Sequence, residues 1–263
     1  MIKFNFFRRE KEEPIYLDCY TASHFAYNFA KIDYAQKYFP DWWLKENKVT
    51  PNGVSTIKHC SAFIDSYTKG IVLPLWGEVE IIVNALGDES PYTWKSSNED
   101  FDLHSNCHSK AQWSGFGNDN LYNIKFVSPW VFKTNDLVYF AWSQPTWSQP
   151  DTFNSLTGLP GVVQYKTQSF TAINYVVEQK KESQTINLPS LTPMAILHPM
   201  TEREVVIRTH LVDETKMHKL LRRGGGMLLD STNDHALDRK TRLKTRKKKF
   251  WDKADKLNKG PFK

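Results

Sequence analysis

A chain of 263 residues is long enough for one substantial domain with extensions or for two small domains. Its 40% hydrophobic and 14% aromatic content exceeds that of disordered chains, so the composition predicts a mainly globular protein. The net charge of +6 is unevenly distributed, because residues 213–263 hold 16 Lys and Arg against 7 Asp and Glu. The preceding residues have a net charge of −3, which predicts a mildly acidic body followed by a basic tail.

Membrane, disulfide and cofactor signals are weak throughout the sequence. No run of about eighteen or more apolar residues occurs, and the N-terminus lacks the apolar stretch of a signal peptide. The three cysteines, Cys19, Cys60 and Cys107, are widely spaced and form no C-x-x-C pair. We therefore expect no membrane partner, no disulfide framework and no cofactor, in a reducing cytoplasm.

Residues 1–50 are predicted to form an N-terminal extension that packs on the body. The Tyr and Phe content around residues 15–20 favours a short strand. Loops are expected to follow, with a short helical turn before Pro40. The body itself is expected to cover residues 51–211.

The clearest local pattern is a helix followed by a strand. Apolar residues recur at helical spacing: Ile57, Cys60, Phe63, Ile64 and Tyr67. Ser55 or Thr56 can cap the start of this helix, and Gly70 is expected to end it in the left-handed conformation. Residues 71–83, IVLPLWGEVEIIV, then predict one long strand with Val79, Ile81 and Val83 on the same face.

From there to about residue 210, short β-branched and aromatic runs alternate with turn residues. The runs are PYTWKSS, NIKFVS, LVYFAWS, GVVQY, FTAINYVVEQ, QTINL, MAILHPM and EVVIRTH. Turn signals spaced roughly 8–12 residues apart are typical of an all-β antiparallel sandwich or jelly roll. Because no βαβ alternation occurs, a parallel sheet is not expected.

A duplicated segment, WSQPTWSQP, spans residues 142–150. Trp142 is in phase with Val138 and Phe140 on a strand period of two, so we expect it in the core, where replacement by Ala should cost about 3–5 kcal/mol. Trp147 follows Pro145, which cannot donate a hydrogen bond to a sheet. Trp147 is therefore expected at an exposed strand end, where it either stacks on a ligand or covers the sheet.

Few residues suggest catalysis or metal binding. His104 and His108, with Cys107 between them, could bind a metal if the chain turned there, but ordinary loop histidines fit the surrounding sequence better. His108, Gln112 and Asp65 are the weak catalytic candidates, and no nucleophile-elbow sequence supports them. No metal site is therefore predicted.

Residues 212–263 are expected to form a basic helical tail. A short amphipathic helix through Met217, Leu220 and Leu221 should end at the three glycines 224–226. Residues 239–263 then hold 12 Lys and Arg against 2 Asp, with two aromatic residues inside the charged run. The candidate binding residues are Arg239, Lys240, Arg242, Lys244, Arg246, Lys247, Lys248, Lys249, Phe250 and Trp251. Such density favours contact with nucleic acid, although docking on a neighbouring subunit or a solvated tail stays open.

Three stretches carry a resemblance to a known group of proteins. They are AQKYFPDWWLKEN, TIKHCSAFIDSYTKGIVLPLWGEVEI, and the later segment that includes LPGVVQYKTQSFTAINYVV. Over residues 15–205 the chain resembles an uncharacterised protein family of large tailed bacteriophages, of the marine cyanophage type. The resemblance implies a phage origin but no chemistry, and Ser61 and Ala62 replace the Pro-Gly of the family pattern.

The segment PGVVQYKTQSF also resembles the nucleotide-binding hairpin of trimeric dUTP pyrophosphatases. Gln164 and Lys166 stand where that hairpin carries acidic residues, which argues against a nucleotidase.

We therefore expect a non-enzymatic phage structural or assembly protein in the host cytoplasm or the virion, with other phage structural proteins or nucleic acid as partners. Homo-oligomerisation stays open. The alternatives are a small-molecule or nucleotide enzyme with its site at the mouth of the β-fold, and a carbohydrate-binding module that uses the aromatic residues as stacking platforms.

Overall fold

The computed structural model describes residues 12–88, 90–97, 119–148, 155–168 and 172–223. The strands are β1 (Ile15–Thr21), β2 (Asp33–Tyr34), β3 (Ile71–Pro74), β4 (Val79–Val83), β5 (Tyr92–Ser96), β6 (Leu121–Val127), β7 (Val131–Lys133), β8 (Phe140–Ser143), β9 (Leu156–Gly158), β10 (Gly161–Val163), β11 (Ala172–Glu178), β12 (Gln184–Leu188), β13 (Pro193–Pro199) and β14 (Val205–Leu211). The helices are α1 (His24–Asn28), α2 (Asp41–Lys45), α3 (Ser61–Lys69) and α4 (Glu214–Arg223), with 3-10 turns η1 (Ala35–Tyr38), η2 (Ile57–His59) and η4 (Thr146–Ser148). The predicted β-rich, largely antiparallel body is confirmed.

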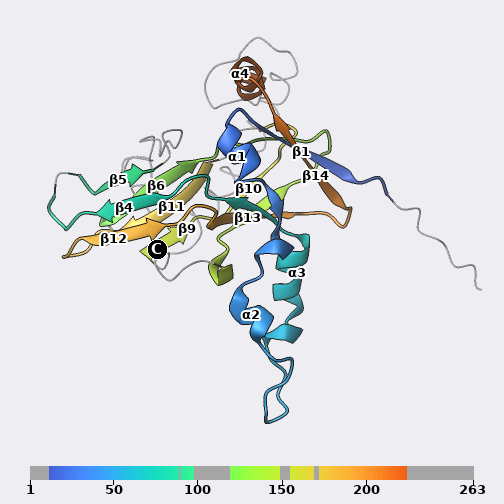
Figure 1. Ribbon diagram of the computed structural model, residues 1–263, viewed down its shortest axis with the longest axis horizontal. Coiled ribbons are helices and arrows are strands. Elements are labelled where there is room, and N and C mark those ends of the chain that lie inside the picture. Colours follow the sequence, from blue (N-terminus) through green and yellow to red (C-terminus); the bar gives the residue numbers. More distant parts are fainter. Residues whose placement is uncertain (1–11, 89, 98–118, 149–154, 169–171, 224–263) are drawn as a thin grey trace, which may run out of the picture.

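In the part of the chain that the structure describes, the strands form four small sheets. Their orders are β14-β1-β7, β10-β8-β13-β3-β2, β6-β11-β9 and β12-β4-β5. Figure 1 shows β4, β5, β6, β11 and β12 on one side of the molecule and β1 and β14 on the other, with β10 and β13 between them. Helices α2 and α3 extend away from all of these strands (Figure 1).

One strand pair departs from the antiparallel prediction. Strands β1 and β14 pair in parallel, from Ile15 opposite Val205 to Thr21 opposite Leu211. Parallel strands need a long connection, and here nearly the whole described chain separates the two strands. The absence of βαβ units argued against a parallel sheet, and the sheet β14-β1-β7 is indeed mixed, with one parallel and one antiparallel pair.

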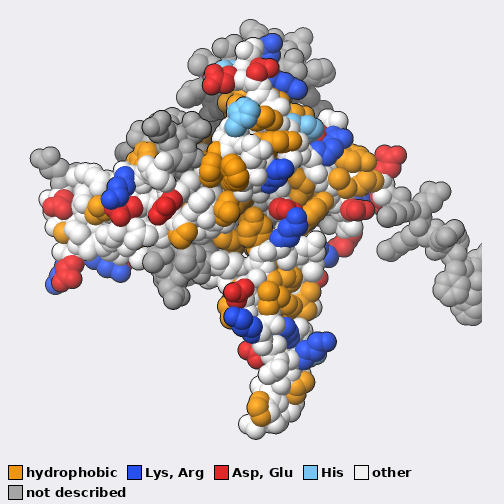
Figure 2. All heavy atoms as spheres, in the orientation of Figure 1, with side chains coloured by type: hydrophobic (Ala, Val, Ile, Leu, Met, Phe, Trp, Pro, Cys, Tyr) orange, Lys and Arg blue, Asp and Glu red, His pale blue; other side chains and the backbone are white. Residues whose placement is uncertain are grey.

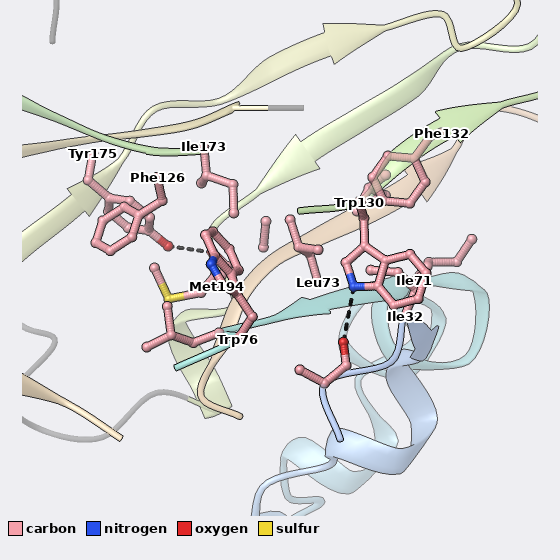
Figure 3. Close-up of a cluster of buried hydrophobic side chains, with 14 of the residues drawn as sticks. Ile32, Ile71, Leu73, Trp76, Phe126, Trp130, Phe132, Ile173, Tyr175 and Met194 are labelled. Atoms are coloured by element: carbon pink, nitrogen blue, oxygen red, sulfur yellow. Dashed lines mark hydrogen bonds between the residues drawn. The ribbon is translucent and has the colours of Figure 1, made fainter. Parts of the chain in front are cut away.

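The main core gathers buried side chains from all four sheets. Figure 3 shows part of it, around Leu73, Phe126 and Trp130. Two buried polar groups in it find backbone partners. Trp130 Nε1 donates to the carbonyl oxygen of Ala30 at 3.1 Å, and Tyr175 Oη donates to the carbonyl oxygen of Met194. Because these groups are hydrogen-bonded, the large aromatic side chains can be buried without leaving an unpaired donor.

The predicted helix exists but is shorter at its start and ends differently. Thr56 caps η2, and α3 begins at Ser61. Gly70 has φ −76°, so the predicted left-handed stop is wrong. A Cβ at Gly70 would collide with the carbonyl oxygen of Ser66 and would lie 2.6 Å from Ile196 Cγ2, so close packing requires the glycine.

The single long strand predicted over residues 71–83 is also wrong. Strands β3 and β4 lie in different sheets, separated by residues 75–78. Pro74 stands at the break, where it cannot donate a hydrogen bond to a sheet. The predicted shared face of Val79, Ile81 and Val83 is confirmed, since all three side chains are buried.

The other strand predictions agree with the structure. Each of the eight runs predicted between residues 91 and 210 contains or overlaps a strand. The strand near residues 15–20 and the helix through Met217 and Leu220 are present as β1 and α4. Among the described helices, none combines the length and apolar character needed to span a membrane.

Candidate functional site

Residues 41–60, called the arm below, project from the sheets (Figure 1). Helix α2 follows Pro40 and carries Asp41 in its first turn and Lys45 in its last, both favourable for the helix dipole. Beyond it the chain reverses in a tight turn, where Thr50 N donates to the carbonyl oxygen of Val54 at 2.8 Å. Gly53 has φ +80°, a conformation that glycine adopts without strain. Local hydrogen bonds thus give the arm a defined shape.

An aromatic cluster lies at the base of the arm. Its members are Phe39, Trp42, Trp43, Phe63, Tyr67 and Trp147. The ring centroids of Phe39 and Trp43 are 4.4 Å apart, and those of Phe63 and Tyr67 are 5.0 Å apart. Phe63 and Tyr67 are buried in a small core that is separate from the main core. Stacked rings thereby attach the arm to α3. The small core also contains Val72 of β3 and Ile196 of β13, so α3 packs on the five-stranded sheet, called the central sheet below.

Trp147 completes this cluster from a distant part of the chain. It lies on η4, which two residues separate from the end of β8, and its ring centroid is 6.0 Å from that of Trp42 and 5.7 Å from that of Phe63. Trp42 Nε1 donates to the carbonyl oxygen of Trp147 at 3.2 Å. With 54% of its surface exposed, Trp147 has the accessible strand-end position that the sequence predicted.

The neighbouring residue Ser148 locks η4 in place. Its Oγ donates to the carbonyl oxygen of Tyr38 at 2.8 Å and is also hydrogen-bonded to Tyr67 Oη. These contacts connect Ser148 to Tyr38 of η1 and to Tyr67 of α3. Trp147 is held against the arm although its side chain remains open to solvent.

The arm exposes several apolar side chains to solvent. Leu44 and Val54 are 56% and 63% exposed, and Trp42 and Val49 are also exposed. Figure 2 shows hydrophobic side chains along the arm as far as its tip. Charged groups lie between them, and Lys58 Nζ sits 4.5 Å from the centre of the Trp43 ring. Together with Trp147, the exposed apolar residues of the arm form the candidate docking surface.

A serine–histidine contact lies beside this surface, between α3 and the central sheet. His198 Nε2 is 2.9 Å from Ser66 Oγ, and His198 Nδ1 is 3.5 Å from Ser143 Oγ. Burial lowers the pKa of His198, and the hydrogen bond with Ser66 opposes that shift only in part. In the described residues no carboxylate is hydrogen-bonded to His198, so an imidazolium there would lack the charged partner of a nucleophile–base–acid triad. We interpret the contact as a polar link between α3, β8 and β13.

A second polar group lies on the parallel pair β1–β14. Asp18 accepts hydrogen bonds from Arg208 through both carboxylate oxygens and from His210 Nε2 at 2.8 Å. Burial tends to raise the pKa of Asp18, but the hydrogen bonds and charges of Arg208 and His210 outweigh burial and hold the pKa below its usual value. Tyr20 stacks on the His210 ring at 4.6 Å. The group joins the first described strand to the last.

The site residues predicted from the sequence are not brought together. Asp65 lies on the exposed face of α3. His104, His108, Gln112 and the tail residues 239–251 lie outside the described part of the chain. Within that part, no group of three or more His, Cys, Asp or Glu side chains is arranged to hold a metal.

Sequence reasoning missed the arm. Its only local signals were Pro40 before α2 and the turn sequence TPNGV at residues 50–54. Comparison with protein-family models, curated proteins and solved structures finds no match to the chain.

Proposed function

We propose that the chain is a structural or assembly protein of a tailed bacteriophage that docks on another phage protein through the arm. The observation that carries this proposal is a projecting segment that exposes Leu44, Val54 and neighbouring apolar side chains. Exposed hydrophobic surface of this kind is typical of an interaction site. The phage assignment itself rests on the sequence resemblance.

The arm suits docking because its base is already ordered. The stacked rings and the hydrogen bond between Trp42 and Trp147 hold the arm in one arrangement, which lowers the entropy lost on binding. Trp is also enriched among the residues that dominate binding energy at interfaces. Burial of an exposed Leu or Val contributes about 1.5–3 kcal/mol before the cost of association. The partner that fits is a protein with an apolar groove.

Two features expected from the sequence belong to the same proposal. The strands are proposed to form a sandwich or jelly-roll body, and residues 212–263 a basic helical tail that contacts nucleic acid or a neighbouring subunit. Deletion of residues 236–263 should abolish most DNA or RNA binding. With about six to ten phosphate contacts, affinity should fall on the order of a thousandfold between about 50 and 200 mM salt. Binding that does not depend on salt would contradict the proposed role of the tail.

The direct test is mass spectrometry of purified phage particles and assembly intermediates. We expect the wild-type chain in one of them, and at least a tenfold loss of incorporation for the double variant Leu44→Asp, Val54→Asp. Leu137→Asp is the matched control, because Leu137 is 73% exposed in the β7–β8 loop outside the arm. Circular dichroism checks that all variants fold. Absence of the wild-type chain from particles and intermediates, or equal incorporation of the arm variant, would overturn the proposal.

A further inference from the structure

A cavity of about 320 Å³ lies where the chain crosses between two sheets. Strand β9 pairs with β11, whereas β10, two residues later, pairs with β8 of the central sheet. Leu159 and Pro160 make the crossing, and Leu159 N donates to the carbonyl oxygen of Asn174 at 2.8 Å. The two sheets separate at this point, and residues from both line the cavity.

A glycine keeps the cavity open beside Trp142. Gly161 is directly opposite Trp142 in the β8–β10 pair, and directly opposed residues project to the same face of a sheet. A Cβ built at Gly161 would meet no atom within 4 Å, so the space next to the tryptophan is free. Trp142 itself is half-buried and packs against the main core on its other side.

The lining combines aromatic, aliphatic and carboxamide side chains. Trp142 supplies an aromatic ring, Leu159 and Pro160 an aliphatic surface, and Gln168 and Asn174 carboxamides, whereas Tyr165 is fully buried behind them. Of the residues that the structure places in the lining, none is charged. Since a desolvated anion or cation needs an opposite charge or several hydrogen bonds, the lining favours a neutral ligand.

The carboxamides retain hydrogen-bonding capacity for such a ligand. Asn174 Oδ1 accepts from Asn123 Nδ2 at 3.4 Å, whereas Asn174 Nδ2 has no partner among the described residues. The exposed Gln168 side chain likewise forms no hydrogen bond within the described part of the chain. A carboxamide can donate and accept at the same time, which matches a hydroxyl group.

We propose that this cavity binds one neutral sugar unit of a carbohydrate. A sugar ring presents C–H groups on its face, which suit Trp142, and hydroxyl groups on its rim, which suit Gln168 and Asn174. The volume is at the small end of ligand pockets, about 300–1,000 Å³, so the cavity suits a single ring. This inference is independent of the docking arm, because the arm contributes no residue to the lining.

Saturation-transfer NMR on the full-length protein with glucose, galactose, mannose and N-acetylglucosamine tests the proposal. We expect at least one of these sugars to bind with a dissociation constant on the order of 1 mM, as its few non-hydrogen atoms allow. Gly161→Leu should weaken binding at least tenfold, since its side chain occupies the free space beside Trp142. If that variant does not fold, Gln168→Leu should weaken binding through lost hydrogen bonds.

Two controls separate this proposal from the docking function. Trp147→Ala removes a tryptophan outside the cavity, and the double arm variant alters the docking surface, so both should bind the sugar as the wild type does. Adenosine, uridine and their monophosphates serve as competing ligands of different chemistry. The proposal is wrong if none of the four sugars binds, if Gly161→Leu and Gln168→Leu leave binding unchanged, or if a nucleoside or nucleotide binds in preference.

Discussion

The main core and the aromatic cluster at the base of the arm are both apolar, but they differ in what surrounds them. The main core draws on all four described sheets, and its side chains are almost completely covered. The aromatic cluster draws on α2, α3, η4 and the residues next to them, and it leaves Trp42 and Trp147 exposed. Coverage from several directions stabilises a fold, whereas an apolar group covered on one side remains available to a partner.

The duplicated segment places one tryptophan in each region. Trp142 packs against the main core and borders the cavity, while Trp147 joins the aromatic cluster. The two tryptophans of the repeated sequence thus lie in different environments, because Trp142 lies on β8 and Trp147 lies on η4, the turn that follows. Four experiments test how the regions of the molecule differ, from the largest expected effect to the smallest.

Trp130→Ala should have the largest effect on the main core. Trp130 is 1% exposed, and its Nε1 donates to the carbonyl oxygen of Ala30. Removal of the ring leaves a cavity and an unpaired carbonyl, so the free energy of unfolding should fall by about 3–5 kcal/mol. Urea denaturation measures this change. A loss as small as that of an exposed tryptophan would contradict the assignment of Trp130 to the core.

Gly70→Ala tests the junction that carries α3. The added methyl group would collide with the carbonyl oxygen of Ser66 and lie 2.6 Å from Ile196 Cγ2. Overpacking of this kind costs about 1–3 kcal/mol. Gly161→Ala is the matched control, since its methyl group meets no atom within 4 Å. Thermal unfolding of the two variants should show a lower midpoint only for Gly70→Ala.

The paired variants Trp142→Ala and Trp147→Ala compare the two regions directly. Trp142 is half-buried rather than fully buried, so the expected loss for Trp142→Ala falls from the value for a core residue to about 2 kcal/mol. Trp147→Ala removes a side chain that is 54% exposed and should cost less than about 1 kcal/mol. Denaturation curves measured under one set of conditions compare them, and equal losses would remove the distinction.

The smallest expected effect is on the pH dependence of stability at His198. Burial holds the pKa of His198 below its ordinary value of 6.5, so the unfolded chain binds a proton there before the native chain does. The free energy of unfolding should therefore decrease as the pH falls below about 6.5, until the native site is also protonated. The difference between wild type and His198→Gln, measured by urea denaturation at several pH values, isolates this contribution. A wild-type profile that matches the variant would show that His198 does not contribute.

The sequence predicted local features where periodicity or turn chemistry was strong. The alternation of Val79, Ile81 and Val83 identified a half-buried strand, and the helical spacing of Met217 and Leu220 identified α4. Predictions failed where one local pattern was compatible with two different structures. Gly70 was expected to supply a left-handed turn, but its missing Cβ instead permits close approach of Ile196.

By itself, the sequence determined which short segments extend, which one forms α4, and that Trp147 lies at an accessible strand end. Only the tertiary structure decided that β3 and β4 enter different sheets, that β1 pairs with β14 in parallel, and that Gly161 lies next to Trp142 at the edge of a cavity. The physical reason is the distance along the chain over which each interaction acts. Side-chain periodicity and backbone preference act over a few residues, whereas strand pairing and packing depend on contacts between segments far apart in the chain.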